Sequence, residues 1–145
     1  MDFTNRILIE RGEDVVPRTE KEAAAVLAKI IHANRFTLYE YFITDKVGHA
    51  QDAAMAEHIL KSLSLFIREL LAMLELSRTT VILVSDHGNI EDLSLRNHTL
   101  NRVPTIIWGA NREQVAVRIQ SLTDITPAIV ALLTKNLASN AGTQN

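Results

Sequence analysis

Two stretches of the chain carry apolar residues at the spacing of an amphipathic helix. In the first, Thr19 and Glu22 have the spacing of a capping box, and an alanine-rich segment follows as far as Asn34. The second covers residues 50–76, where one stripe contains Met55, Ile59, Leu63, Phe66, Leu70 and Leu74. Both stretches therefore predict helices that pack one face against a core.

Three shorter stretches have the apolar, β-branched and aromatic composition of buried strands. They are residues 36–44, 79–85 and 103–108, and Pro104 places the third near a sheet edge or at a strand start. Each is followed by polar residues. Strands of this kind, separated by helical patterns, are typical of parallel sheets.

Cap residues further along the chain predict two final helices. Asn111 precedes one, and Thr123 or Asp124 precedes the other, which we expect to end near Leu133. The whole order predicts an α/β fold, a largely parallel sheet flanked by helices, with sites where the strands end.

Composition narrows the class of protein. The chain has 145 residues, of which 47% are hydrophobic and 22% charged, and this predicts one domain over residues 1–135 with a polar tail over 136–145. The net charge of −2, without a basic cluster, argues against nucleic-acid binding. The sequence contains no run of 18 apolar residues and no secretory signal pattern, so we expect a cytoplasmic protein that does not bind membranes.

The chain has no cysteine, which leaves histidine and carboxylate as ligands for a transition metal. Asp45 and His49 are four residues apart, so a helical turn would bring both side chains to one face. Asp86 and His87 are adjacent and precede Gly88, and His98 follows in a polar stretch. Together these five residues offer a ligand set that zinc, manganese or iron accepts.

Each of these residues also has a plainer explanation when it is taken alone. An aspartate at a strand exit often caps a turn, and an isolated histidine usually faces solvent or bonds locally. His32 and His58 have no carboxylate at ligand spacing, so we leave them outside the site. Glu91 and Asp92 fit a solvated loop, with support of metal ligands as the alternative.

Three motifs in sequence order, Thr44-Asp45-Lys46-Val47-Gly48-His49, Val84-Ser85-Asp86-His87-Gly88-Asn89 and Asn97-His98-Thr99, resemble the C-terminal metal-binding half of the alkaline phosphatase superfamily. The residues of these motifs are most similar to those of the branch that contains cofactor-independent phosphoglycerate mutase and phosphopentomutase. The resemblance covers roughly residues 36–133. It implies an alkaline-phosphatase-like fold whose N-terminal part is missing from this chain.

The resemblance also implies roles for the five residues. Asp45, His49 and His98 would hold one divalent ion, zinc or manganese. Asp86 and His87 would help to hold a second, and such ions orient a phosphoryl or sulfuryl group between them. Because the second site would lack its other ligands, we expect one tightly bound ion in this chain.

The family mechanism further requires a Ser or Thr nucleophile and an N-terminal Asp ligand, and residues before 36 show no strand that ends in such an Asp. We therefore expect the metal-binding half of a binuclear phosphoryl-transfer enzyme of phosphatase or phosphomutase type. Its nucleophile would come from a missing N-terminal region or a partner chain. We assign no catalytic residue, and we expect the isolated chain to be inactive toward small phosphorylated or sulfated substrates.

Two alternatives stay open. The first is a metal-binding or structural remnant without catalysis, which the missing nucleophile favours. The second is a mononuclear metal hydrolase in which Asp45, His49 and His98 activate water directly.

Overall fold

The computed structural model describes residues 2–141, with side chains up to residue 134. The chain divides into two compact units. The first contains Met1–Leu74 and His87–Pro104, and the second contains Glu75–Asp86 and Thr105–Asn145. We describe each unit by itself.

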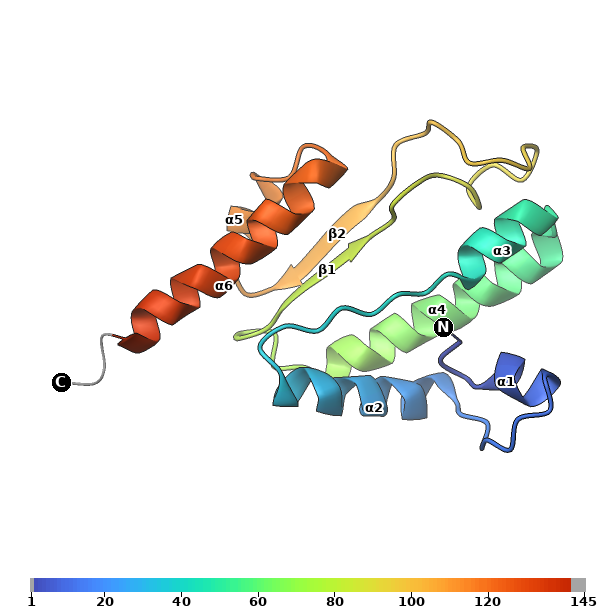
Figure 1. Ribbon diagram of the computed structural model, residues 1–145, viewed down its shortest axis with the longest axis horizontal. Coiled ribbons are helices and arrows are strands. Elements are labelled where there is room, and N and C mark those ends of the chain that lie inside the picture. The colour runs from blue at the N-terminus through green and yellow to red at the C-terminus, as the bar shows by residue number, and fades with distance from the viewer. Residues whose placement is uncertain (1, 142–145) are drawn as a thin grey trace. The chain divides into compact units, whose positions relative to one another are not determined.

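Two long helices form the framework of the first unit, as the sequence predicts. Helix α2 (Glu20–Ala33) begins with the expected capping box, in which Thr19 Oγ1 accepts from the Glu22 amide at 3.2 Å and the Glu22 carboxylate accepts from the Thr19 amide at 2.8 Å. Helix α4 (Ala53–Met73) begins where Asp52 accepts a hydrogen bond from the Met55 amide. The two helices pack side by side (Figure 1).

Aromatic side chains fill the core beside α4. Phe66 is 3% exposed, and its ring stacks on that of Phe3 with centroids 4.3 Å apart. The ring of Tyr41 also stacks on that of Phe3, with their centroids 5.1 Å apart. The segment before α2 also contains a short helix that the sequence pattern did not predict, α1 (Arg6–Glu10).

The expected strand over residues 36–44 is wrong. Residues 36–42 lie outside any strand, and helix α3 (Ile43–Ala50) begins within the predicted segment. Ile43 and Val47, both buried, are four residues apart and pack with Ala56 of α4. A short apolar run satisfies the strand pattern and the buried-helix pattern equally well, and here the tertiary contacts select the helix.

The second unit contains a two-stranded sheet at the two remaining positions that the sequence predicts. Strands β1 (Thr80–Val84) and β2 (Thr105–Gly109) pair with Thr80 opposite Gly109. The pairing is antiparallel and not parallel as expected. The described connection between them, residues 85–104, contains no helix, so it lacks the helical crossover that usually joins parallel neighbours.

Short helical segments follow β2. Asp124, a predicted cap of the final helix, bonds to the start of one of these segments. Its carboxylate accepts from the Ser121 amide at 2.8 Å, at the start of the 3-10 helix η1 (Leu122–Asp124). The other predicted cap, Asn111, precedes helix α5 (Arg112–Ala116) in a left-handed conformation and makes no side-chain cap bond.

Helix α6 (Ile125–Ala141) closes the second unit and continues beyond the expected end near Leu133. The predicted polar tail, residues 136–145, therefore overlaps α6 in part, and its last four residues lie outside the described structure. Among the helices of the described chain, none combines the length and the apolar character that a membrane span requires.

Candidate metal centre

Helix α3 presents Asp45 and His49 on one face. Asp45 lies in the first turn and His49 in the last, and Asp45 Oδ1 is 3.3 Å from His49 Nε2. The opposite face of the helix is fixed, because Ile43 and Val47 are buried against α4. The four-residue spacing therefore does what the sequence predicts, although it acts within a helix and not after a strand.

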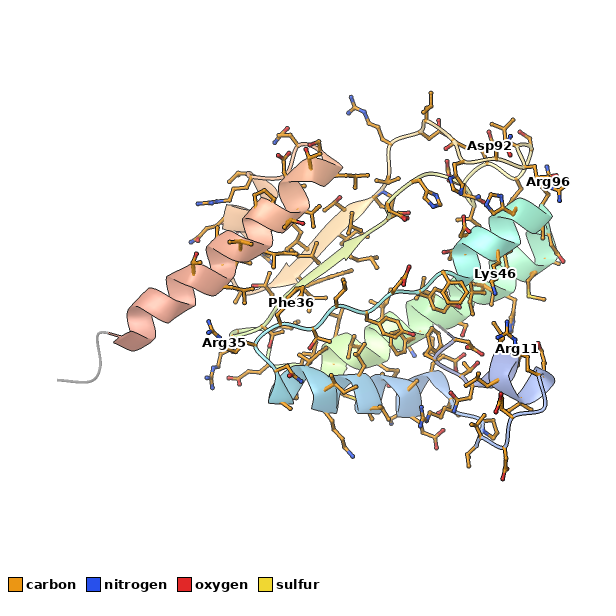
Figure 2. All side chains as sticks on the ribbon, in the orientation of Figure 1. Arg11, Arg35, Phe36, Lys46, Asp92 and Arg96 are labelled. Carbon is orange, nitrogen blue, oxygen red and sulfur yellow. The ribbon has the colours of Figure 1, made fainter. Side chains whose placement is uncertain are left out.

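The polar stretch after β1 brings two more imidazoles to the same carboxylate. Asp45 Oδ1 is 3.1 Å from His98 Nε2 and 3.8 Å from His87 Nε2. The rings of His87 and His98 stack with their centroids 3.6 Å apart and an interplanar angle of 15°. Figure 2 shows Asp92 and Arg96 on the stretch that joins these two histidines, and Lys46 on α3.

These distances fit a divalent ion. A tetrahedral site with metal–ligand bonds of about 2.0–2.1 Å requires donor atoms about 3.3 Å apart. The contacts from Asp45 to His49 and His98 meet this spacing. The residues whose ligand atoms all lie within 4.8 Å of one another are Asp45, His87 and His98. His49 joins this group through its 3.3 Å contact with Asp45, and its ring centroid lies 5.0 Å from that of His98. The four side chains are 29–48% exposed, which leaves the cluster open to a small substrate.

The hydrogen bonding of His49 also suits a metal ligand. Its Nδ1 lies 2.6 Å from the backbone carbonyl oxygen of Arg96, which can only accept, so this nitrogen carries the proton. In the neutral ring the lone pair is then on Nε2, which faces Asp45. A backbone carbonyl that fixes the second nitrogen in this way is a common feature of metal-binding histidines.

Asn89 supports Asp45 from within the protein. It is 4% exposed, its Nδ2 lies 3.4 Å from Asp45 Oδ1, and its buried Oδ1 has no hydrogen-bond partner among the described residues. A Cβ atom added to Gly48 would overlap Asn89 Oδ1 and lie 2.5 Å from Asn89 Cγ. Gly48 is therefore the residue that lets Asn89 reach the carboxylate.

Asp86, the fifth predicted ligand, belongs to the second unit and directly precedes His87 in the chain. The two histidines that the sequence analysis left outside the site have other surroundings. His58 contacts Arg6 at 3.1 Å, and His32 lies in the last turn of α2. The structure thus brings together Asp45, His49, His87 and His98.

Glu91 bonds to the two segments that carry His87 and His98, so it makes more contacts than the solvated loop that the sequence favoured would require. Its carboxylate accepts hydrogen bonds from the Thr99 hydroxyl, the Asn101 amide at 3.1 Å and the Asn89 backbone amide at 2.6 Å. The bond from Thr99, assisted by the others, lowers the pKa of Glu91 to about 2. Asp92 instead accepts local bonds from the amide and hydroxyl of Ser94, as expected for a loop turn. Thr99 and Asn101 are eight and ten residues from Glu91, so no local pattern reveals these two partners.

Comparison with known proteins agrees with the motifs. The sequence model of the metalloenzyme superfamily matches residues 5–137. The chain is similar to the 2,3-bisphosphoglycerate-independent phosphoglycerate mutase of Wolbachia pipientis wMel, with 32% identity over 122 residues, or 77% of this chain and 24% of the relative. The enzyme of the same name from Mycoplasma pneumoniae is 29% identical over 103 residues, or 67% of this chain and 20% of the relative.

A third relative of that name, from Antithamnion sp., is 26% identical over 132 residues, which cover 81% of this chain and 26% of the relative. The chain therefore spans about a quarter of the length of the curated relatives it matches. No solved structure gives a significant match. The comparisons confirm the resemblance that the three sequence motifs carry.

Proposed function

The chain belongs to the metalloenzyme superfamily, and from this premise we propose that it supplies the metal-binding part of a binuclear phosphoryl-transfer enzyme. The family assignment and the phosphoglycerate mutase relatives support metal-dependent phosphoryl transfer. The number of ions, the individual ligands and the origin of the nucleophile are our proposal.

The observation that carries the proposal is the convergence of three imidazoles on one carboxylate oxygen. Asp45 Oδ1 has His98, His49 and His87 nitrogens at 3.1, 3.3 and 3.8 Å. In the first site, Asp45 supplies the anionic ligand, and His49 and His98 supply neutral nitrogens. A divalent ion bound there would polarise a phosphoryl oxygen and stabilise the charge that develops on it.

His87 and Asp86 are our candidates for the second site. The ring of His87 stacks on that of His98 with centroids 3.6 Å apart, so His87 lies next to a ligand of the first site. Two protein ligands hold a divalent ion weakly, so we propose that the remaining ligands and the Ser or Thr nucleophile come from a further polypeptide segment or a partner chain. The greater length of the relatives supports this division.

The substrate is, in this proposal, a small phosphorylated molecule. The relatives that resemble the chain are named phosphoglycerate mutases, and phosphoglycerate is a small phosphorylated molecule. The half-exposed cluster can admit a phosphate group directly.

A mononuclear hydrolase is the second candidate, because Asp45, His49 and His98 form a three-ligand set that is open to water. The purified chain separates the two possibilities. We measure bound metal after dialysis against zinc or manganese and the turnover of p-nitrophenyl phosphate, for the wild type and for His98→Ala.

Our proposal predicts close to one ion per chain, lost in His98→Ala, with turnover near background because the covalent step lacks its nucleophile. Robust turnover that His98→Ala abolishes would instead establish the mononuclear hydrolase. A chain that binds no metal would be a structural remnant, and both proposals would be wrong.

A further inference from the structure

Two segments carry the imidazoles that approach Asp45 from outside α3. We call residues 87–91 the His87 arm and residues 98–101 the His98 arm. We propose that Glu91 is a positioning residue that ties these arms together and so sets the spacing of His87 and His98. This inference deepens the proposed function and rests on it where metal binding is concerned.

The Glu91 carboxylate bonds to both arms at once. Oε2 accepts from the backbone amide of Asn89 in the His87 arm at 2.6 Å. Oε1 accepts from the hydroxyl of Thr99 and, at 3.1 Å, from the side-chain amide of Asn101, both in the His98 arm. Thr99 is the residue next to His98, so the bond fixes the backbone from which the imidazole extends.

Close packing accompanies these bonds. The Thr99 amide donates to the Gly88 carbonyl oxygen at 2.9 Å, which forms an isolated antiparallel bridge between the arms. A Cβ atom at Gly88 would overlap Thr99 Oγ1 and lie 2.5 Å from Glu91 Oε1. The hydroxyl and the carboxylate therefore occupy the space that a side chain at residue 88 would need, directly after His87.

The consequence of this connection is the stacked pair of imidazoles. The ring centroids of His87 and His98 lie 3.6 Å apart, and the Nε2 atom of each ring is within 3.8 Å of Asp45 Oδ1. Beside the single backbone bridge, the carboxylate accepts one bond from the His87 arm and two from the His98 arm. Because hydrogen bonds to a charged acceptor are stronger than neutral ones, Glu91 is well suited to hold the two arms together.

Glu91→Gln removes the charge and one acceptor oxygen with little change in shape. Thr99→Val removes the hydroxyl and keeps the branched shape. Asp92→Asn is the matched control, because it removes the same charge one residue away and its partner Ser94 lies outside both arms. Thr99→Ser restores the hydroxyl and serves as the conservative rescue.

Two measurements are made on each variant of the full chain. The first is the ring-proton NMR spectrum of the metal-free protein, in which the stacked imidazoles shift each other's resonances and give cross-ring nuclear Overhauser effects. The second is the dissociation constant of Zn²⁺, determined by competition with a chromophoric chelator. Circular dichroism confirms that each variant is folded before it is compared.

We expect Glu91→Gln and Thr99→Val to lose the cross-ring effects and to weaken Zn²⁺ binding about 10- to 100-fold, the range found when residues that orient metal ligands are replaced. The double variant should be no weaker than the stronger single variant, because both changes break one connection. Asp92→Asn should remain within about threefold of the wild type, and Thr99→Ser should recover the cross-ring effects.

The metal-free spectrum keeps the two proposals distinguishable. If the wild type binds no Zn²⁺ but its cross-ring effects depend on Glu91, the proposed function fails and the positioning role stands. If folded Glu91→Gln keeps both the ring contacts and the wild-type affinity, the positioning role is overturned. Should Glu91→Gln fail to fold, Thr99→Val decides by the same two readouts.

Discussion

Replacing Gly48 with alanine tests the packing that supports the candidate metal centre. On an exposed helix this change would stabilise the protein by about 1 kcal/mol, because alanine has the higher helix propensity. Gly48 lies in α3 and is buried, and the new Cβ would overlap Asn89 Oδ1. We therefore predict the opposite sign.

The size of the change in the free energy of unfolding follows from the displacement of Asn89. Asn89 Cγ would be 2.5 Å from the new atom, and the backbone amide of Ile90 would be 3.2 Å away, so Asn89 must leave its buried position and the loop cannot follow freely. Overpacking costs about 1–3 kcal/mol, and loss of the bond from Asn89 to Asp45 adds about 1 kcal/mol. After the gain in propensity, Gly48→Ala should lower the free energy of unfolding by about 1–3 kcal/mol.

Urea denaturation followed by circular dichroism measures this change. The matched control is Ala72→Gly on the exposed side of α4, one residue before its end, which should cost up to about 1 kcal/mol through propensity alone. Combining Gly48→Ala with Asn89→Ala removes the overlap. The double variant should therefore be more stable, by at least about 1 kcal/mol, than the sum of the two single effects predicts. A Gly48→Ala protein at least as stable as the wild type would refute the reasoning.

Three further changes test other parts of the chain. Thr19→Ala removes the capping box of α2 and should lower the free energy of unfolding by about 1 kcal/mol, while Thr19→Ser should change it little; denaturation curves decide. Phe66→Ala opens a cavity beneath the Phe3 ring and should cost about 3–5 kcal/mol, and a cost below 1 kcal/mol would contradict the assigned core. The hydrogen bond from Thr99 lowers the pKa of Glu91 to about 2 from its usual 4.5, so its contribution to stability is present above pH 4.5 and is lost as the pH falls toward 2. Glu91→Gln should flatten this part of the stability-versus-pH curve, and a curve of unchanged slope would contradict it.

Local features of the sequence predicted local features of the structure. The capping box at Thr19 and Glu22 involves residues three apart, so its geometry is encoded where it acts. The same holds for Asp45 and His49, whose spacing brings them to one face of any helical turn. The site prediction for this pair was therefore independent of the wrong strand over residues 36–44.

Features that depend on distant partners were not predictable in the same way. Ile43 and Val47 read as part of a strand because their burial against Ala56 is not visible in a short apolar run. The direction in which β1 and β2 pair depends on the path of the connection between them. Glu91 likewise bonds to Thr99, and the sequence gives no periodic signal for a contact of this kind.

The central claim is that Asp45, His49 and His98 hold a divalent ion, and zinc anomalous diffraction tests it most directly. Crystals of the chain grown with Zn²⁺ are measured above and below the zinc absorption edge. We predict a strong anomalous peak about 2.0–2.2 Å from Asp45 Oδ1 and from the Nε2 atoms of His49 and His98, absent in His98→Ala and retained in Asp86→Ala. No peak at this cluster, or strong zinc only at His32 or His58, would contradict the account.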